Sequence, residues 1–427
     1  MKVLIWCPHV NMGGGIRLLS QLAPALAHRR EIEAVRLAGP PGFKWEKFGL
    51  AGVPRLELYE ITPSPHSGWV SRQLRREGRI LRVRGTGRAK NFLARWLLGD
   101  KAVKWDKEWA EQMRRASGGC DVVYAFWPHR QKFYSPGKPL VCTFQDTTVL
   151  DFPEVIGLQE RDKEFALSYE WLRASAQVVV SSRATRSNLV RLFGQEYESA
   201  IVIPHAILPT NHHTHASLSR ALARRLPTRY VIFPANITTH KNHYTLFVAW
   251  SRFARRRELP LILFGEGTET LTTNEGMHLL VDRLRGLIGR AGLRAGEDFY
   301  ALGYVGDADV MPLIRGAAAL VMPTLAEGGG SYPVEEALSV GVPVLCSDIP
   351  VMREHLAGRS AKVLWFDPES ADSILRALTE LFDNYDEYKA AALNAVHDLR
   401  YTWDDIAAQY VRAFRAAIEK TENERQQ

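Results

Sequence analysis

One segment decides the fold of this chain: Val321-Met322-Pro323-Thr324-Leu325-Ala326-Glu327-Gly328-Gly329-Gly330-Ser331-Tyr332-Pro333-Val334-Glu335-Glu336-Ala337. It reads as a buried strand, a glycine-rich loop and the first turns of a helix, and Pro333 in a first-turn position marks the helix start. Successive glycines let backbone amides come close to a ligand, and the helix amino terminus adds partial positive charge. We therefore predict that a diphosphate binds at Gly328, Gly329, Gly330 and Ser331.

Two carboxylates flank this loop. Glu327 precedes the glycines, and the first helical turn carries Glu335 and Glu336. A carboxylate can accept two hydrogen bonds from a vicinal diol, which a sugar ring and a ribose both present. The simpler interpretation is an ordinary strand-to-helix turn whose acids favour the helix dipole. The combination of acids, glycines and helix start favours a site that holds a diphosphate between two diols.

Outward from this segment, short apolar runs alternate with longer amphipathic stretches along nearly the whole chain. The runs are near-continuous in Val, Ile and Leu, as in strands that are covered on both faces of a parallel sheet. This alternation predicts an α/β fold with doubly wound sheets. The predicted strands comprise residues 3–7, 122–127, 140–144, 178–181 and 201–204, and then 230–234, 261–264, 300–305, 319–323, 344–347 and 363–366.

The alternation breaks once, in a turn-rich stretch before Tyr230. We predict an N-terminal domain over residues 1–208, a linker over 209–228 and a second domain over 229–400. Two open sheets imply a cleft, with ligand sites outside the carboxyl ends of the strands. Lys241 follows the first strand of the second domain and can neutralise a diphosphate as a point charge. Taken alone, this lysine is better explained as a solvated surface residue.

Composition sets broad limits on the class of protein. With 427 residues, of which 46% are hydrophobic and 24% charged, the chain is expected to be soluble and to form two domains. It shows no secretory signal and no apolar run of the roughly 20 residues that span a bilayer. The four cysteines are widely separated and predict buried thiols in a reducing compartment, so we expect a cytoplasmic protein.

The positive charge is concentrated in one stretch. Residues 69–98 hold eight arginines and one lysine against a single acid, Glu77, interleaved with apolar side chains. Such a segment suits an anionic membrane surface, here the inner face of the cell membrane. A solvated pair of helices explains it equally well. No recognised nucleic-acid-binding module is present, so no nucleic-acid partner is expected.

The motifs of the second half resemble family 4 of the retaining glycosyltransferases, which carries a Glu-x7-Glu signature followed by Ala and, further on, Gly-x-Pro-Val. Glu327 and Glu335 have that spacing here. Further matching motifs follow the family order: Val202-Ile203-Pro204, Leu263-Phe264-Gly265-Glu266-Gly267, Leu302-Gly303-Tyr304-Val305, Gly341-Val342-Pro343-Val344 and Phe366-Asp367-Pro368. The resemblance implies the GT-B architecture, in which two Rossmann-like domains face each other across a cleft. It also implies a last helix, about 403–420, that returns to the first domain.

The resemblance further implies roles for individual residues. Glu327 would contact the transferred sugar, the helix glutamate would bind the ribose, and Lys241 with the glycine amides would stabilise the departing diphosphate. Tyr304 and Val305 would hold the nucleobase through backbone atoms. The family keeps the anomeric configuration by same-face attack, with the leaving phosphate taking the acceptor's proton. Preorganised donors at the phosphate oxygens are then the largest expected catalytic contribution.

Two departures from the family pattern concern the donor site. Alignment by spacing selects Glu335 as the ribose ligand, whereas alignment through the helix selects Glu336. We favour Glu336, because a helix register is harder to shift than a glycine loop. The family often has an arginine five residues before the lysine, and Asn236 stands there, which removes a cation. We keep Asn236 among the predicted donor-binding residues.

The first half contributes two further motifs. Gly13, Gly14 and Gly15 follow the first strand and open a helix, and by the resemblance they line the cleft near donor and acceptor. A strand-end motif that is His-Asp in the family reads Gln145-Asp146 here. We place Gln145 and Asp146 among the catalytic residues, since the Gln145 amide can bind a sugar hydroxyl.

Three other features have simpler explanations than a site. Asp307-Ala308-Asp309 imitates the metal-binding D-x-D of another glycosyltransferase fold and is better explained as a helix cap. The histidines at 212, 213 and 215 lie in the linker without carboxylate or cysteine partners. His129 could replace the missing imidazole, although a lone histidine beside aromatic residues is more often structural. We expect no catalytic metal and no cofactor.

The predicted activity is the transfer of a hexose or deoxyhexose from a nucleotide diphosphate sugar to a glycan or lipid-linked acceptor in surface polysaccharide synthesis. The segment from Pro234 to His243 resembles that of enzymes that use GDP-mannose, so mannose is favoured, and GDP is favoured over UDP. Alternatives on the same fold are a nucleotide-sugar epimerase and a phosphorylase. A scaffold that binds glycans or membranes without catalysis is a further alternative.

Overall fold

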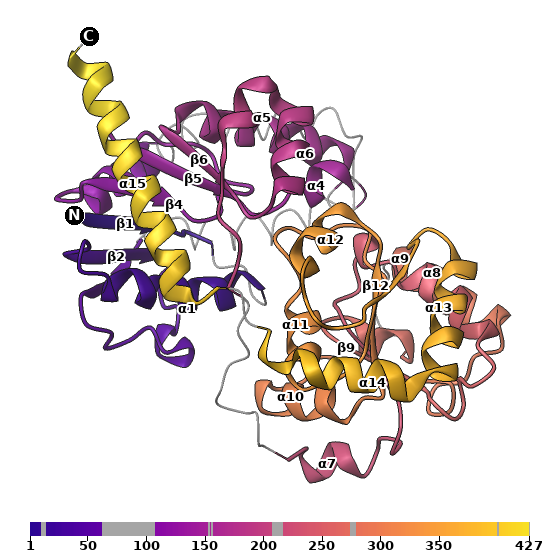
Figure 1. Cartoon of the computed structure of the whole chain (residues 1–427). Helices are drawn as coiled ribbons and strands as arrows, with labels where there is room; N and C mark the ends of the chain where they lie inside the picture. Colours follow the sequence, from indigo (N-terminus) through magenta and orange to yellow (C-terminus); the bar gives the residue numbers. More distant parts are fainter. Residues whose placement is uncertain are drawn as a thin grey trace.

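A computed structural model describes residues 1–9, 14–61, 107–152, 154, 157–206, 217–273, 279–398 and 401–426. Gly13, the basic stretch 69–98 and the linker histidines lie outside these residues. The described residues form two separate parallel sheets (Figure 1), which confirms the predicted α/β fold class. Among the described helices, none is long and apolar enough to cross a membrane.

The first sheet has seven strands in the order β3-β2-β1-β4-β5-β6-β7. The apolar-run criterion misses β2 and β3. Arg36 interrupts the apolar residues of β2, and β3 lies at the sheet edge, alternates leucine with charged or aromatic residues and stays half-exposed. The strands are β1 (Lys2–Trp6), β2 (Ala34–Gly39), β3 (Leu56–Glu60), β4 (Val122–Ala125), β5 (Leu140–Phe144), β6 (Gln177–Val180) and β7 (Ile201–Val202).

A C-terminal helix completes the first domain. Helix α15 (Trp403–Gln426) packs against α1 (Gly14–His28) and lies across the first sheet (Figure 1), as predicted. Its buried face includes Ile406, Tyr410 and Phe414. The other helices of this domain include α4 (Thr148–Asp151), α5 (Leu158–Ala174) and α6 (Arg183–Phe193).

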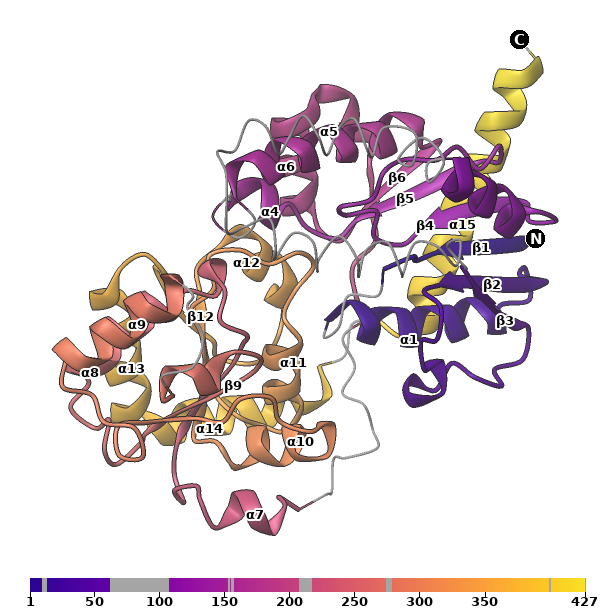
Figure 2. The same ribbon diagram turned by 180° about the vertical axis from the view of Figure 1, so that it is seen from behind.

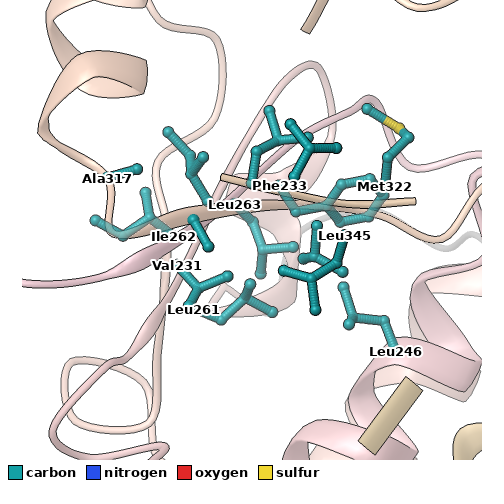
Figure 3. Close-up of a cluster of buried hydrophobic side chains, with 14 of the residues drawn as sticks. Val231, Phe233, Leu246, Leu261, Ile262, Leu263, Ala317, Met322 and Leu345 are labelled. Atoms are coloured by element: carbon teal, nitrogen blue, oxygen red, sulfur yellow. The ribbon is translucent and has the colours of Figure 1, made fainter. Parts of the chain in front are cut away.

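The second sheet has six strands in the order β10-β9-β8-β11-β12-β13. Fully buried side chains such as Val231, Phe233 and Leu263 form its core (Figure 3). The strands are β8 (Val231–Pro234), β9 (Leu261–Phe264), β10 (Phe299–Ala301), β11 (Ala319–Met322), β12 (Val344–Ser347) and β13 (Leu364–Phe366). The helices include α7 (Arg220–Ala223), α8 (His243–Arg252), α9 (Leu279–Arg290), α10 (Asp307–Gly316), α11 (Tyr332–Ser339), α12 (Pro350–Leu356), α13 (Ala371–Asp383) and α14 (Tyr385–Asn394).

The strand order of the second sheet reverses between β8 and β11, which are neighbours in the sheet. Open parallel sheets bind ligands beside such a reversal, outside the carboxyl ends of the strands. The loop after β8 carries Lys241, and the loop after β11 carries Glu327 and the glycines. Helix α12 contacts α6 of the first domain (Figure 2), so this edge of the second sheet faces the first domain.

Candidate functional site

Lys241 and Glu327 form an ion pair at the strand-order reversal. Lys241 Nζ lies 2.5 Å from Glu327 Oε1, and the two side chains are 22% and 12% exposed. The fold thus brings together two predicted site residues that are 86 positions apart. The pair combines a cation that can bind phosphate with an acid that can bind a diol.

The residues beside Lys241 fix its position. Asn242 adopts a left-handed conformation with φ of 60°, and its buried amide donates to the carbonyls of Pro323, at 3.0 Å, and Pro368, at 2.7 Å. The His240 carbonyl accepts a hydrogen bond from the Leu325 amide at 2.7 Å. The lysine loop is therefore tied to the loop that carries Glu327.

The glycine loop lies directly against the first domain. The Gly328 carbonyl accepts hydrogen bonds from Ser182 Oγ at 2.9 Å and Thr185 Oγ1 at 3.2 Å. A Cβ on Gly328 would overlap the Gln145 carbonyl, and a Cβ on Gly329 would lie 2.7 Å from Ser181 Cβ. The sequence interpretation explained the glycines by a phosphate alone. The structure adds a second reason, which is the close approach of the two domains.

The amides of this loop remain available to a ligand. Within the described part of the chain, the amides of Gly328, Gly329 and Gly330 donate no hydrogen bond. They lead into α11, whose amino terminus carries partial positive charge. The loop, the helix start and Lys241 therefore form a region that can accept an anion.

The two helix glutamates point to different partners. Glu335 Oε1 and Oε2 each accept a hydrogen bond from Arg359 Nη2 at 2.6 Å, and Oε1 lies 2.8 Å from His355 Nε2. Glu336 Oε1 instead lies 2.7 Å from Arg17 Nη1 on α1 of the first domain. Glu335 is thus held inside an ion-pair cluster, whereas Glu336 faces the other domain. Of the two, Glu336 is therefore the one that pairs with an arginine of the first domain.

Hydrogen bonds to neighbouring residues fix the position of the Gln145 side chain. Its side-chain oxygen lies 2.8 Å from His205 Nε2, and its amide nitrogen lies 3.4 Å from the Phe126 carbonyl. Burial and the neighbouring His355 lower the pKa of His205 to about 3, so the ring is neutral and Nε2–H donates to Gln145. Asp146 accepts a hydrogen bond from the Thr148 amide at 2.9 Å. Gln145 and Asp146 therefore shape the cleft wall opposite Gly328.

The region predicted for the nucleobase lies at the ends of β9 and β10. Val305 is buried, while the Tyr304 side chain is 76% exposed. Asn236 accepts a hydrogen bond from the Glu266 amide at 2.8 Å and so joins the loops after β8 and β9. Asn236 therefore has a structural role here and supplies no charge to the phosphates.

A cavity of about 530 Å³ lies between the domains, on the side of the glycine loop where Glu335 is buried. Gly329, His205 and Glu335 belong to its lining. Glu354 on α12 also lines it and accepts hydrogen bonds from the amides of Arg183 and Ala184 at the start of α6. A carboxylate of the second domain therefore caps a helix of the first.

The structure gives the contacts of two segments that the sequence analysis set aside, Asp307-Ala308-Asp309 and His129. The cap predicted at Asp307-Ala308-Asp309 is wrong, because the N-cap residue is Gly306 without a side-chain hydrogen bond, while Asp309 accepts from the Ser219 amide. His129 Nδ1 lies 2.6 Å from Glu164, a buried acid of α5. The latter contact ties the loop after β4 to α5.

Sequence reasoning missed Arg17 and His205. Arg17 lies in the first turn of α1, two residues after Gly15, and a cation beside the glycines was the available signal. Gly14 and Gly15 are the first residues of α1. His205 follows β7 and carries no motif, so only its contact with Gln145 identifies it.

Comparisons with known proteins identify similar transferases. Residues 216–397, which include the whole second sheet, match the family model of glycosyl transferases group 1. The chain is 28% identical over 311 residues to the O-antigen chain mannosyltransferase B of Escherichia coli, covering 69% of this chain and 74% of that protein. It is 23% identical over 334 residues to an uncharacterized glycosyltransferase of Methanocaldococcus jannaschii, covering 74% and 82%.

Solved structures share the fold along nearly the whole chain. Anabaena HepE in complex with UDP and glucose superimposes with a TM-score of 0.66 at 16% identity, covering 97% of this chain and 100% of that chain. WaaG, a glycosyltransferase involved in lipopolysaccharide biosynthesis, superimposes with a TM-score of 0.59 at 14% identity, covering 97% and 99%. At these identities the likeness concerns the fold alone.

Proposed function

We propose that this chain is a glycosyltransferase of the GT-B architecture, similar to family 4, whose second half is a group 1 transferase domain. It transfers a hexose or deoxyhexose, preferably mannose, from a nucleotide diphosphate sugar to a glycan or lipid-linked acceptor. The anomeric configuration is retained.

The ion pair of Lys241 and Glu327 beside the free glycine amides carries this proposal. When the donor binds, Lys241 and the amides contact the phosphates, and Glu327 contacts hydroxyls of the sugar. The bond between the anomeric carbon and the phosphate oxygen breaks, and the acceptor oxygen bonds to the same face of that carbon. The acceptor's proton passes to the leaving phosphate. Fixed donors at the phosphate stabilise the charge that develops there, and the reaction needs no metal.

The donor is a nucleotide sugar whose base lies at Tyr304 and Val305 and whose ribose lies at Glu336. The relative from Escherichia coli is a mannosyltransferase by name, which supports mannose. The HepE structures hold UDP or UDP-glucose, which supports a nucleoside diphosphate without selecting the base. We favour GDP, on the resemblance of the lysine loop to that of enzymes that use GDP-mannose.

The acceptor belongs to a surface polysaccharide. An O-antigen chain transferase is among the relatives, and a lipopolysaccharide transferase shares the fold. The first domain, with Gln145 and Asp146 in the cleft wall, binds the acceptor. The protein works in the cytoplasm, and its basic stretch 69–98 contacts the inner face of the membrane.

A transfer assay tests this proposal. The full chain is incubated with GDP-mannose, UDP-glucose or ADP-glucose and a fluorescent mannosyl oligosaccharide, in EDTA. We expect a product one sugar longer, with the donor's anomeric configuration by NMR. Glu327→Ala and Lys241→Ala should each lower turnover by roughly 10²- to 10³-fold while the chain stays folded.

Each alternative gives a different result in the same assay. Conversion of the donor sugar without acceptor indicates an epimerase, and turnover that requires inorganic phosphate indicates a phosphorylase. Binding of the oligosaccharide without turnover of any donor indicates a scaffold. An inverted anomeric linkage contradicts the retaining mechanism.

A further inference from the structure

An arginine of the first domain reaches helix α11 of the second. Arg17 Nη1 lies 2.7 Å from Glu336 Oε1, and the guanidinium lies over the Tyr332 ring, 5.4 Å from its centroid. The Arg17 side chain is 35% exposed and that of Glu336 is 7% exposed. The Glu336 carboxylate is therefore largely enclosed, while the Arg17 side chain keeps some exposure to solvent.

An unsatisfied polar atom lies beside this pair. The Tyr332 hydroxyl is buried and has no hydrogen-bond partner among the described residues. Tyr332 is the first residue of α11, and its ring packs against the apolar core of the first domain. A buried hydroxyl without a partner costs free energy, so a ligand oxygen that pairs with it would stabilise the bound state.

The charges near the start of α11 form two pairs, each of one acid and one cation. Lys241 pairs with Glu327 inside the second domain, and Arg17 pairs with Glu336 across the domains. A third acid, Glu335, is already bonded to Arg359. A sugar nucleotide brings negative charge on its two phosphates. It also brings one vicinal diol on either side of them, in the sugar and in the ribose. The two cations and two acids match these groups one for one.

We propose that Arg17 is a donor-binding residue, whose guanidinium passes from Glu336 to the diphosphate when the sugar nucleotide binds. The exchange frees the Glu336 carboxylate for the ribose diol. This inference rests on the proposed function and specifies how the same site holds its donor. A guanidinium suits this exchange, because it forms paired hydrogen bonds with carboxylate and phosphate alike. Since Arg17 and α11 belong to different domains, donor binding also strengthens the contact between them.

The test compares ligands with and without phosphates. Wild type, Arg17→Ala and Arg17→Lys are titrated calorimetrically with GDP and guanosine, and with UDP and uridine in parallel. We expect Arg17→Ala to weaken binding of the nucleoside diphosphate by at least about tenfold and to leave nucleoside binding within about twofold. Arg17→Lys keeps the positive charge but loses the planar guanidinium that forms paired hydrogen bonds. Its affinity for the diphosphate should therefore lie between those of wild type and Arg17→Ala.

Arg183→Ala is the matched control. Arg183 also lies in the first domain, and its Nε is 3.4 Å from Glu354 of the second, so the variant removes an arginine–glutamate contact across the same interface. Its affinity for GDP should equal that of the wild type. Equal weakening in Arg183→Ala and Arg17→Ala would overturn the inference, because contact between the domains would then explain both.

Other outcomes separate this inference from the proposed function. If Arg17→Ala binds GDP like wild type while Lys241→Ala does not, the role of Arg17 is wrong and the proposed function stands. Equal losses for GDP and guanosine also overturn it, because Arg17 then acts on the nucleoside through Glu336. If the wild type binds no nucleoside diphosphate, the proposed function itself fails. Should Arg17→Ala unfold, unchanged GDP affinity in Arg17→Lys overturns the inference.

Discussion

Glu335 and Glu336 are adjacent in sequence and face different surroundings. A helix turns by about 100° per residue, so neighbouring side chains cannot share one partner set. Glu335 lies with Arg359 and His355, while Glu336 meets Arg17. Spacing alone favoured Glu335, and only the helix register favoured Glu336. The sequence could therefore narrow the predicted ribose ligand to two residues, and the structure adds that their side chains have different partners.

The two glutamates should respond differently to the same change. Glu335→Gln leaves the Arg359 charge without its buried acid, so we expect a loss of unfolding free energy on the order of 3 kcal/mol in denaturant titrations. Glu336→Gln should instead mainly weaken nucleotide binding, because that acid is proposed to bind the ribose. The reverse pattern, with Glu335→Gln losing nucleotide and keeping stability, would contradict this assignment.

His243 should make stability depend on pH. Burial and the neighbouring Lys241 lower its pKa from 6.5 to about 3. Below pH 6.5 the unfolded chain takes up a proton that the folded chain excludes, so the free energy of unfolding falls as the pH is lowered. At pH 5 this histidine costs roughly 1 to 2 kcal/mol relative to neutral pH.

The variant His243→Phe keeps a ring beside Phe233 and cannot be protonated. Its loss of unfolding free energy between pH 7.5 and pH 5 should therefore be smaller than that of wild type by roughly 1 to 2 kcal/mol. Denaturant titrations at both pH values measure the difference. Parallel pH profiles for wild type and variant would show that His243 is not kept neutral by the fold.

At the scale of elements, the glycine loop shows what a motif can and cannot reveal. The strand, the glycines and the helix start could all be predicted from the sequence, because each has a local signature. The residues of the first domain against which the loop packs could not be predicted. Gln145, Ser181 and Ser182 come from the ends of β5 and β6, far away in sequence. A motif therefore predicts its own conformation better than its neighbours.

Gly329→Ala should separate the domains at this loop. The added methyl would lie 2.7 Å from Ser181 Cβ and 3.0 Å from His205 Nδ1, so the loop or the first domain must move. We expect at least a roughly tenfold loss of transfer activity and a larger radius of gyration by X-ray scattering. Gly289→Ala in α9 is the control, because a methyl there meets nothing within 4 Å. Full activity in Gly329→Ala would show that the close approach is not needed.

At the scale of the whole molecule, the two-domain layout was predictable and the interface was not. Buried strands appear in the sequence as continuous apolar runs. The helix α15, which returns to the first domain, has its apolar face at Ile406, Tyr410 and Phe414. The edge strand β3 lacks such a run because it lies at the edge of the sheet, where its side chains stay partly exposed. Contacts such as Arg17 with Glu336 join residues 319 positions apart, and no local pattern encodes them.

In the proposed function, the cleft binds the diphosphate of a sugar nucleotide through Lys241 and the loop after Glu327. Calorimetric titration of the full chain with intact GDP-mannose, for wild type and Lys241→Ala, tests it most directly. We predict measurable binding by wild type and a weakening of roughly tenfold to hundredfold in the variant, about 1.4 to 2.8 kcal/mol. Equal affinity in both proteins, or no affinity of wild type for GDP-mannose, UDP-glucose and ADP-glucose alike, would contradict it.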